Sequence, residues 1–411
     1  MADPATPLSG YQRRLFVFLG VATFFEGYDF LAFFQILPHL RRDMGLSEGD
    51  AGWLLAFINF GTMMAYLLIR KADGWGRKPL LTVTIAGYTL FTFLTSFAPE
   101  VYSFAICQFL ARIFLLAECA TSMMYAAEEF PADRRGMVIG VINAASSLGS
   151  IVCAGVAPLL TRTSYGWRSV YLVGILPLVI LAFARRNLRE TQRFTERAGQ
   201  AASAARTSLF RIWRTPYRRR LLHLAAIWAC VYVCSQNAVS LWKDFALNER
   251  GLGDGEAGLA ITFAALGSAP LIFAAGKLLD VAGRKRGAAI IFLAMTIGVF
   301  LAYTLQGQWP LTFALTLAVF GVSSFLAVLN AFTAELFPTD LRGDAFAWSN
   351  NLLGRITYVL SPIFIGMLAN EIGWSTPVRA TTIFPVIALI LVLVLLPETR
   401  NRELEETSNL A

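Results

Sequence analysis

Apolar residues fill long uninterrupted runs of this chain rather than short alternating or amphipathic stretches. A run of about 20 apolar residues, folded as a helix, is long enough to cross the hydrocarbon layer of a membrane, which is about 30 Å thick. Strands of a membrane barrel would be about ten residues long and would alternate in polarity. The pattern therefore predicts an all-α membrane protein with twelve transmembrane helices, which begin near Leu15, Ala51, Leu80, Val101, Met137 and Ser169 and then near Leu221, Ala257, Ala288, Leu311, Ala345 and Arg379.

One long polar segment divides these runs into two sets of six. Residues 185–220 are rich in Arg, Ala, Ser and Thr, and composition shifts of this kind mark domain boundaries. We predict an N-terminal six-helix half at 1–184, a basic cytoplasmic linker at 185–220, and a C-terminal six-helix half with a cytoplasmic tail at 221–411.

The two predicted halves repeat each other in sequence. KADGWGRKPLL at 71–81 and GKLLDVAGRKRG at 276–287 share Asp-x-x-Gly-Arg-Lys, after the second and eighth runs. EEFPADRRG at 128–136 and ELFPTDLRG at 335–343 share Glu-x-Phe-Pro and Arg-Gly, after the fourth and tenth runs. Matches at two corresponding places indicate a six-helix unit used twice.

Composition and charge agree with a membrane protein and indicate its orientation. Hydrophobic residues make up 56% of the chain and charged residues 15%, against roughly 25% charged in soluble proteins. The net charge is +8, and most of the 35 Lys and Arg fall in the loops on one side. Because basic loops stay in the cytosol, we predict a multi-pass protein of the cytoplasmic membrane with both termini cytoplasmic, and no nucleic-acid partner. All five cysteines lie in apolar runs, so we expect neither a metal site nor disulfides.

These motifs resemble the major facilitator superfamily over nearly the whole chain. The resemblance rests on the twelve spans, the loop at 276–285, its counterpart at 73–78, and LPETRNRELEE at 396–406. EGYD at 26–29, EEFPADRRG and the PET tail look like the branch that holds aromatic-acid/proton symporters and organic-ion and sugar porters. The first-half loop departs from the family pattern at Ile69, Lys71 and Gly74.

Charged residues inside apolar runs are the main functional candidates, because a charge in the membrane is costly. Glu26 and Asp29, in FFEGYDF, share one face of the first predicted helix, and Gly27 between them leaves room for a neighbouring backbone. Two poorly solvated carboxylates cannot both ionise cheaply, which suits proton coupling. The alternative is that one of them pairs with Arg112 or with a backbone donor to fix helix packing. Glu118, on a different helix face from Arg112, is a third proton-coupling candidate or part of a buried ion pair.

Two arginines lie near the middle of predicted helices. Arg355, in NNLLGRITYVLSP, resembles a Gly-Arg of the eleventh helix of aromatic-acid and organic-anion transporters, where a cation is associated with anionic substrates. A guanidinium offers a two-pronged contact to a carboxylate. We predict that Arg355 binds a substrate carboxylate; a structural ion pair is the alternative. The further substrate-binding candidates, which could instead serve packing or interhelical bonding, are Arg112, Tyr28, Tyr358, Gln236 and Asn237.

The repeated cytoplasmic loops form a second candidate site. Charge pairs between acidic and basic residues of these loops would latch a cytoplasmic gate, and by family resemblance they would break as the two halves rock about a central site. A solvated charged loop is the alternative. The predicted gate residues are Asp73 with Arg77, Asp280 with Arg284, Glu128 with Arg134 or Arg135, and Glu335 with Arg342.

Together these features predict a secondary transporter rather than an enzyme. We find no phosphate-binding loop, nucleophile motif or metal-ligand spacing, and so we expect no cofactor. The predicted activity is proton-coupled symport of a small organic anion, aromatic or another carboxylate, by alternating access, in a monomer whose partners are its substrate, protons and the lipid bilayer. The alternatives are a sugar or polyol porter, an organic-cation porter and a non-transporting membrane sensor.

Overall fold

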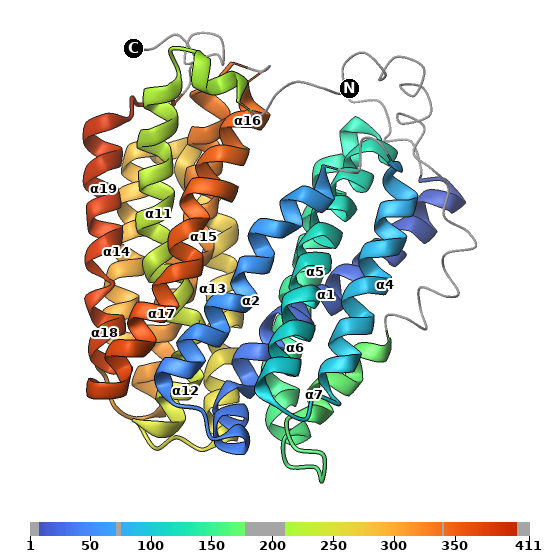
Figure 1. The fold of residues 1–411 in the computed structure, drawn as a ribbon. Helices are drawn as coiled ribbons and strands as arrows, with labels where there is room; N and C mark the ends of the chain where they lie inside the picture. Colours follow the sequence, from blue (N-terminus) through green and yellow to red (C-terminus); the bar gives the residue numbers. More distant parts are fainter. Residues whose placement is uncertain (1–7, 71–74, 177–209, 339–340, 401–411) are drawn as a thin grey trace. The chain divides into compact units, whose positions relative to one another are not determined.

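The computed structural model describes residues 8–70, 75–176, 210–338 and 341–400, and its regular elements are all helices (Figure 1). In this part of the chain ten helices are long and apolar enough to cross a membrane. Of the two other predicted runs, the one near Leu80 forms the 19-residue helix α4 (Arg77–Thr95). The run near Ser169 begins as α7 (Arg168–Leu172) and the short helix η1 (Val173–Ile175) and continues outside the described residues. The predicted all-α membrane fold is confirmed.

The chain forms two compact units. Unit 1 consists of residues 1–44 and 57–206, and unit 2 consists of residues 45–56 and 207–411. The helix α2 (Glu48–Ile69) belongs to both, because its residues 48–56 group with unit 2 and the rest with unit 1. Most of the predicted linker lies outside the described residues, so the boundaries 1–184, 185–220 and 221–411 stay a prediction.

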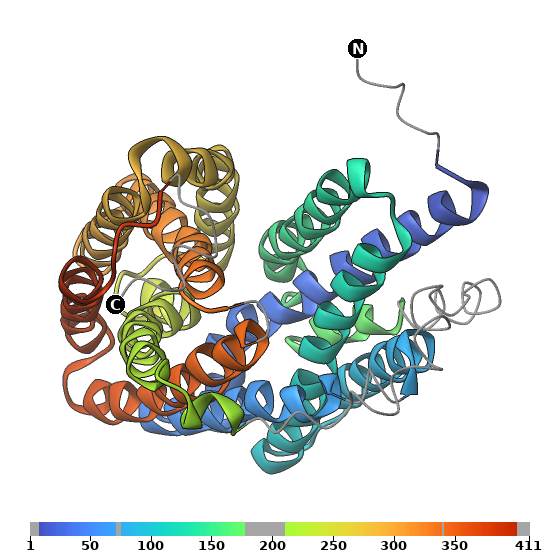
Figure 2. The same ribbon diagram turned by 90° about the horizontal axis from the view of Figure 1, so that it is seen from above.

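Unit 1 is a helical bundle around an apolar core. Its long helices, besides α4, are α1 (Gly10–Met44), α5 (Val101–Glu129) and α6 (Ala132–Leu160). Side chains from these four helices pack together in the core, among them Leu19, Tyr88, Leu115 and Ile142. Seen from above, α1 runs beside α6 along much of its length (Figure 2).

Small residues allow α1 and α6 to cross closely. A Cβ added to Gly27 would lie 1.9 Å from the carbonyl oxygen of Ser146, and one added to Gly149 would lie 1.8 Å from that of Phe24. The Ser150 hydroxyl donates a hydrogen bond to the Gly27 carbonyl across the same crossing, at 2.8 Å. Membrane helices pack where small residues let their backbones approach. The expectation that Gly27 makes room for a neighbouring backbone is therefore confirmed.

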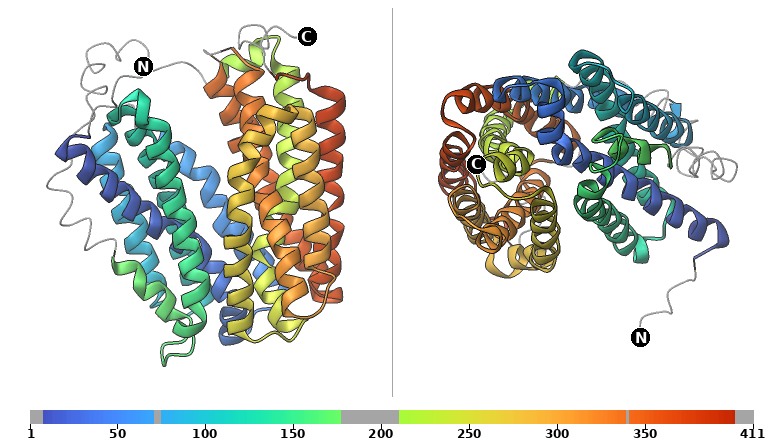
Figure 3. Two further views of the ribbon diagram at one scale, coloured as in Figure 1. Left: turned by 180° about the vertical axis from the view of Figure 1, so that it is seen from behind. Right: turned by 90° about the horizontal axis from the view of Figure 1, so that it is seen from below.

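Unit 2 is a second bundle, with more short helices at the ends of its long ones. Seen from behind, α13, α14 and α15 lie side by side (Figure 3). Gly298 and Gly321 let α14 and α15 touch, because a Cβ at either would lie 2.4 or 2.5 Å from backbone of the other helix. Its helices are α11 (Arg218–Ser240), α12 (Trp242–Asn248), α13 (Asp254–Ala282), α14 (Arg284–Ala302), α15 (Gln308–Glu335), α16 (Arg342–Phe346), α17 (Arg355–Ile372), α18 (Ser375–Ala380) and α19 (Ile383–Leu395), with the short helix η3 (Arg211–Arg214) before α11.

Large apolar side chains cover the outside of this bundle. Phe273, Phe313 and Val394 are 74%, 76% and 73% exposed. Exposed apolar side chains on helices of spanning length are typical of contact with a membrane. The exposed residues are therefore those expected to face lipid.

A π-helix, η4 (Ala347–Gly354), joins α16 to α17. Its last residue is Gly354, where an added Cβ would lie 2.7 Å from the Cβ of Trp228 on α11. Glycine thus lets α17 begin against α11, and Arg355 is the first residue after the π-helix. Segments of π-helix are rare and occur frequently at functional sites.

Candidate functional site

Three carboxylates are buried inside unit 1. Glu26, Asp29 and Glu118 are 6%, 7% and 0% exposed. Glu26 accepts a hydrogen bond from the Ser146 hydroxyl at 2.9 Å, and Asp29 accepts a long one from Thr92 at 3.4 Å. The three side chains come from α1 and α5, and their hydroxyl donors include groups from α4 and α6.

Two of these carboxylates have an oxygen without a hydrogen-bond partner among the described residues, Oδ1 of Asp29 and Oε2 of Glu118. The other Glu118 oxygen accepts from Ser122 at 2.6 Å. Glu26 interacts electrostatically with both Asp29 and Glu118, so the three groups form one cluster. The sequence predicts Glu118 on a different face of its helix from Arg112. In the structure Glu118 neighbours Glu26 of the first helix.

Arg112 is the cation of this cluster. It is 3% exposed, its Cζ lies 4.8 Å from the centre of the Phe30 ring, and its charge acts on Glu26 and Asp29. The buried Tyr28 hydroxyl donates to the carbonyl of Val170 at 3.2 Å, so it already has a structural partner.

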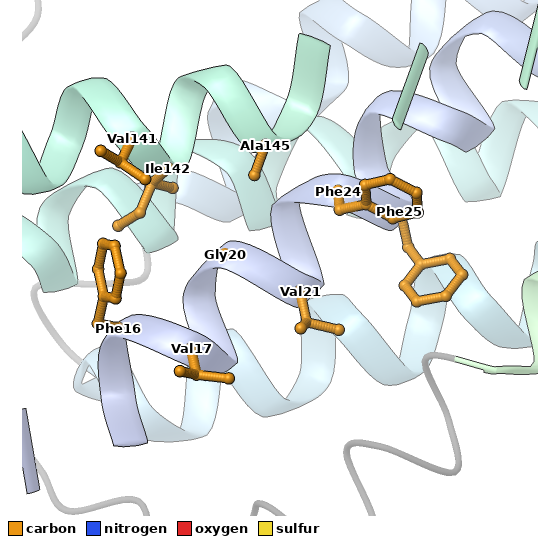
Figure 4. A pocket seen from close by; sticks show the side chains of 9 residues that line it. All are labelled: Phe16, Val17, Gly20, Val21, Phe24, Phe25, Val141, Ile142 and Ala145. Atoms are coloured by element: carbon orange, nitrogen blue, oxygen red, sulfur yellow. The ribbon is translucent and has the colours of Figure 1, made fainter. Parts of the chain in front are cut away.

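A pocket of about 390 Å³ lies beside the same crossing, between α1 and α6 (Figure 4). Its lining is apolar and includes none of the predicted site residues; it consists of Phe16, Val17, Gly20, Val21, Phe24, Phe25, Val141, Ile142 and Ala145. In the described part of the chain no three acidic, Cys or His side chains are placed to hold a metal ion.

Arg355 in unit 2 lies beside a cluster of aromatic rings. Its Cζ is 5.7 Å from the ring centre of Tyr358, which is 5.3 Å from the ring of Tyr232. Trp228 and Phe325 pack on Tyr232 from other sides, at 5.4 and 5.9 Å. Aromatic faces attract cations and stack with planar ligands. The sequence candidates Arg355 and Tyr358 are thus neighbours.

Unpartnered hydrogen-bond donors surround this aromatic cluster. Nε of Arg355, Nε1 of Trp228 and Nε2 of Gln236 are buried and have no partner among the described residues. The Tyr232 hydroxyl instead donates to Oδ1 of Asn350 at 2.5 Å. Buried polar groups are normally paired, so three open donors in one region indicate affinity for an acceptor.

Asn237, the other candidate amide, is bound within the protein. Its Nδ2 donates to the Val233 carbonyl at 2.7 Å and to the Ser361 hydroxyl at 2.9 Å, and its Oδ1 has no described partner. It connects α11 to α17.

The gate candidates form equivalent charge pairs in the two units. Arg77 contacts Glu128 at 3.0 Å, and Arg284 contacts Glu335 at 2.9 Å, with the same separation of 51 residues. Arg284 also contacts Asp280 at 2.7 Å, as predicted. Asp73 and the side chain of Arg135 lie outside the described residues. Glu335 thus pairs with Arg284 rather than with the predicted Arg342, whose buried Nε has no described partner.

Glu398 is a member of this network that sequence reasoning missed. Its carboxylate accepts backbone N–H bonds from Arg284 at 2.8 Å and Lys285 at 3.0 Å, and so caps the start of α14. Burial raises the pKa of Glu398, but backbone N–H donors at Lys285, Arg284, Arg400 and Thr399 outweigh it and hold the pKa below its usual value. The PETR sequence at 397–400 could have indicated this role, but the sequence analysis treated it only as a family motif and assigned no partner to Glu398.

A second structural repeat, which the sequence analysis also missed, lies at the helix ends away from these charge pairs. Gly45 and Gly251 have φ of +66° and +67°, and Gly166 and Gly373 have φ of +57° and +71°. Glycine adopts this backbone conformation without strain. The Trp that follows Gly166 and the Trp that follows Gly373 each meet an acidic residue: the side chain of Trp167 donates to Asp43, and the backbone of Trp374 donates to Glu249. The shared Gly-Leu and Gly-Trp pairs were the available signal.

Comparison with known proteins agrees with this architecture. A family model described as Major Facilitator Superfamily matches residues 19–248 and again residues 229–409. A probable 4-methylmuconolactone transporter of Cupriavidus pinatubonensis is 28% identical, over 92% of this chain and 89% of the relative. A gallate transporter of Pseudomonas putida is 25% identical, over 91% and 89%.

Solved structures share the fold at lower identity. The inward-open xylose transporter XylE from E. coli aligns with a TM-score of 0.75 at 18% identity, over 95% of this chain and 98% of that one. An inward-facing bacterial homologue of the human lysosomal transporter Spinster aligns with a TM-score of 0.77 at 15% identity, over 94% and 97%. The chain belongs to the major facilitator superfamily of membrane transporters, and it is a secondary transporter rather than an enzyme.

Proposed function

We propose that this transporter couples the entry of a small organic anion, an aromatic or other carboxylate, to the entry of a proton. Arg355 binds the carboxylate, with Tyr358 beside it, and the carboxylates of unit 1 carry the proton. The carrier exposes these groups to one side of the membrane at a time, as alternating access requires.

The observation that carries this proposal is the kind of polar group left open in each unit. Around the aromatic cluster of unit 2, donors on Arg355, Trp228 and Gln236 are open, beside one open acceptor, Oδ1 of Asn237. A carboxylate is an acceptor with two oxygens, and a guanidinium stays charged when it is buried. The open donors outnumber the open acceptor and include a guanidinium, which favours an anion over a neutral sugar, and an organic cation would be repelled by Arg355.

The open groups of the carboxylate cluster in unit 1 support a proton-carrying role. One oxygen of Asp29 and one of Glu118 lack a donor, and a carboxyl group with too few donors is buried more cheaply as the neutral acid than as the anion. The cluster holds three carboxylates and the cation Arg112, whose charge acts on Glu26 and Asp29, so it has a surplus of negative charge that a bound proton reduces. Asp29 is the proposed carrier, with Glu26 and Glu118 as coupled partners.

Relatives whose names state a substrate support the proposal of an organic anion. Those named above carry 4-methylmuconolactone and gallate by their names, and another, 22% identical over 90% of this chain, is named a 4-hydroxybenzoate transporter of Pseudomonas aeruginosa. The xylose transporter shares the fold, and at its identity it supports no sugar assignment.

The remaining parts of the proposal concern topology and gating. The charge pairs of Arg77 with Glu128 and of Arg284 with Glu335 and Asp280 are proposed to latch the cytoplasmic gate. Arg342, Arg135 and Asp73 remain predicted members of it, and Tyr28 and Asn237 remain predicted parts of the substrate site. Both termini are proposed to be cytoplasmic, in the cytoplasmic membrane of a monomeric carrier without nucleic-acid partner.

Ligand-induced stabilisation of the purified protein tests the proposal. Aromatic acids, aliphatic carboxylates, sugars and organic cations are compared by thermal shift at pH 5.5 and 7.5, because a ligand that binds the folded state raises its melting temperature. We expect stabilisation by carboxylates, stronger at pH 5.5, and its loss in Arg355→Met. Stabilisation by sugars or cations alone would refute the proposal.

A further inference from the structure

Tyr88 on α4 is a buried phenol whose hydroxyl the fold does not use. The residue is 0% exposed, and its hydroxyl has no hydrogen-bond partner among the described residues. Its ring packs in the apolar core of unit 1 with Leu19, Ala22 and Leu115. Burying an unpaired hydroxyl is unfavourable, and phenylalanine would fill nearly the same volume without that cost. Packing alone therefore does not explain a tyrosine at this position.

A contact between α4 and α1 places Tyr88 beside the carboxylates of α1. Thr92, one turn after Tyr88 on the same face of α4, donates to Asp29 at 3.4 Å. Tyr88 thus lies about 6 Å along the helix axis from the level of Asp29. The α1 residues in its core cluster, Leu19 and Ala22, precede Glu26 in the chain. Tyr88 is therefore on the Glu26 side of Asp29.

Contacts between α4 and α5 place Tyr88 near Glu118 as well. Thr95 accepts from Gln108 at 3.0 Å, and a Cβ added to Gly87 would lie 2.5 Å from the ring of Phe114. The two helices therefore run antiparallel, with Tyr88 level with Leu115. Glu118 is one turn beyond Leu115 on the same face, in the direction of the N-terminus of α4. Long side chains of a helix lean toward its N-terminus, so the Tyr88 ring leans toward Glu118.

The electrostatic neighbours of the Tyr88 hydroxyl agree with this placement. All three carboxylates act on it, Glu118 most strongly and then Asp29 and Glu26. The Thr89 hydroxyl is also near, and it donates to the Ile85 carbonyl at 2.7 Å. The other charged or titratable groups that face this interior are Arg112 and Cys119 of α5, Tyr28 of α1, Cys153 of α6 and Tyr171 of α7.

We propose that Tyr88 is a positioning residue for proton coupling, whose hydroxyl donates a hydrogen bond to the ionised carboxylate of Glu118. This inference rests on the proposed function, because it takes the carboxylate cluster of unit 1 as the proton carrier. An ionised carboxylate only accepts, and a phenol hydroxyl supplies the donor that it needs. Oε2 of Glu118 and the Tyr88 hydroxyl are both without a described partner, as expected of two groups that pair in one protonation state.

The proposal has a consequence for the pH dependence of transport. A donor to the ionised form favours that form, so removing the donor lets the cluster keep its proton up to a higher pH. In Tyr88→Phe we expect the pH of half-maximal uptake to rise by about one unit, which corresponds to a ten-fold change in proton affinity. A purely structural hydroxyl would change the melting temperature and leave this pH unchanged.

Uptake of labelled 4-hydroxybenzoate by proteoliposomes tests the inference, with the full chain and external pH between 5.5 and 8.5. Tyr125→Phe is the matched control, because Tyr125 is also 0% exposed and in the same core, but its hydroxyl bonds that of Tyr11 at 3.4 Å. The control should keep the wild-type pH of half-maximal uptake. A Tyr88→Phe protein whose half-maximal pH is unchanged or lower would overturn the inference.

Two further comparisons separate the possible outcomes. If Tyr88→Phe does not fold, as judged by size-exclusion chromatography, Tyr88→Met also lacks the hydroxyl and should show the same rise. In a Glu118→Gln background Tyr88→Phe should cause no further rise, and a full rise there would overturn Glu118 as the partner. Wild-type uptake that does not depend on pH would overturn the proposed function and this inference together. Wild-type uptake that depends on pH, with the same midpoint in Tyr88→Phe, would overturn this inference alone.

Discussion

Replacing Gly27 by alanine perturbs the crossing of α1 and α6 beside the buried carboxylates. The added Cβ would lie 1.9 Å from the Ser146 carbonyl oxygen, whereas ordinary contacts begin at 3.4 Å, so the two backbones must separate by about 1.5 Å. Overpacking of this kind costs about 1–3 kcal/mol. The 2.9 Å hydrogen bond from Ser146 to Glu26 would be lost with it, at about 1 kcal/mol more.

The measured quantity is the apparent melting temperature of the purified protein in detergent. A loss of about 2–4 kcal/mol should lower it by roughly 5–10 °C for a unit of this size. Gly20→Ala is the matched control, because a Cβ there has nothing within 4 Å and alanine favours the helix by about 0.5–1 kcal/mol. A Gly27→Ala protein as stable as Gly20→Ala would refute the close crossing.

Five further variants test the charge networks by the same stability measurement. Glu335→Gln should cost about 2 kcal/mol because it weakens both contacts to a partly buried guanidinium, whereas Asp280→Asn, whose side chain is 71% exposed, should cost less than about 0.5 kcal/mol; equal losses would contradict this. Because the pKa of Glu398 lies below its usual value of 4.5 in the folded protein, its contribution is complete above that value and is lost as the pH falls through the folded pKa. Glu398→Gln should therefore lower stability at pH 7 and flatten the decline at acidic pH, and an unchanged pH profile would contradict the assignment. Trp374→Phe should cost about 1–3 kcal/mol because it removes the 2.6 Å donor of the fully buried Asp244 carboxylate. Trp167→Phe should cost less because its acceptor, Asp43, is half exposed. A larger loss in Trp167→Phe than in Trp374→Phe would contradict this reasoning.

Much of the fold could be predicted from the sequence because membrane helices are long and apolar. The two repeated loop motifs identified the duplicated unit, and Arg77 and Arg284 do occupy equivalent charge pairs. The partners of those arginines were harder to predict. Glu128 and Glu335 are 51 residues away in sequence from Arg77 and Arg284, and proximity along the chain favoured pairing Glu335 with the nearer Arg342. The predicted pairing of Glu128 with Arg134 or Arg135 stays a prediction.

Other features depend on tertiary contacts that no local pattern encodes. The sequence predicts Lys243 to be a loop cation, yet its side chain is 1% exposed, and its Nζ lies 2.7 Å from Oδ1 of Asp254. The π-helix before Arg355 ends at Gly354, which packs closely against Trp228, more than a hundred residues earlier in the chain. For the same reason Gln236 and Asn237, adjacent and chemically alike, could not be told apart until their partners were known.

Uptake by proteoliposomes tests the central claim most directly. Labelled 4-hydroxybenzoate is offered to vesicles with an alkaline interior, with and without a proton ionophore. The account predicts accumulation that the ionophore abolishes, no uptake by Arg355→Met, and binding without accumulation by Asp29→Asn. Accumulation at the wild-type rate by Arg355→Met, or uptake that ignores the proton gradient, would contradict it.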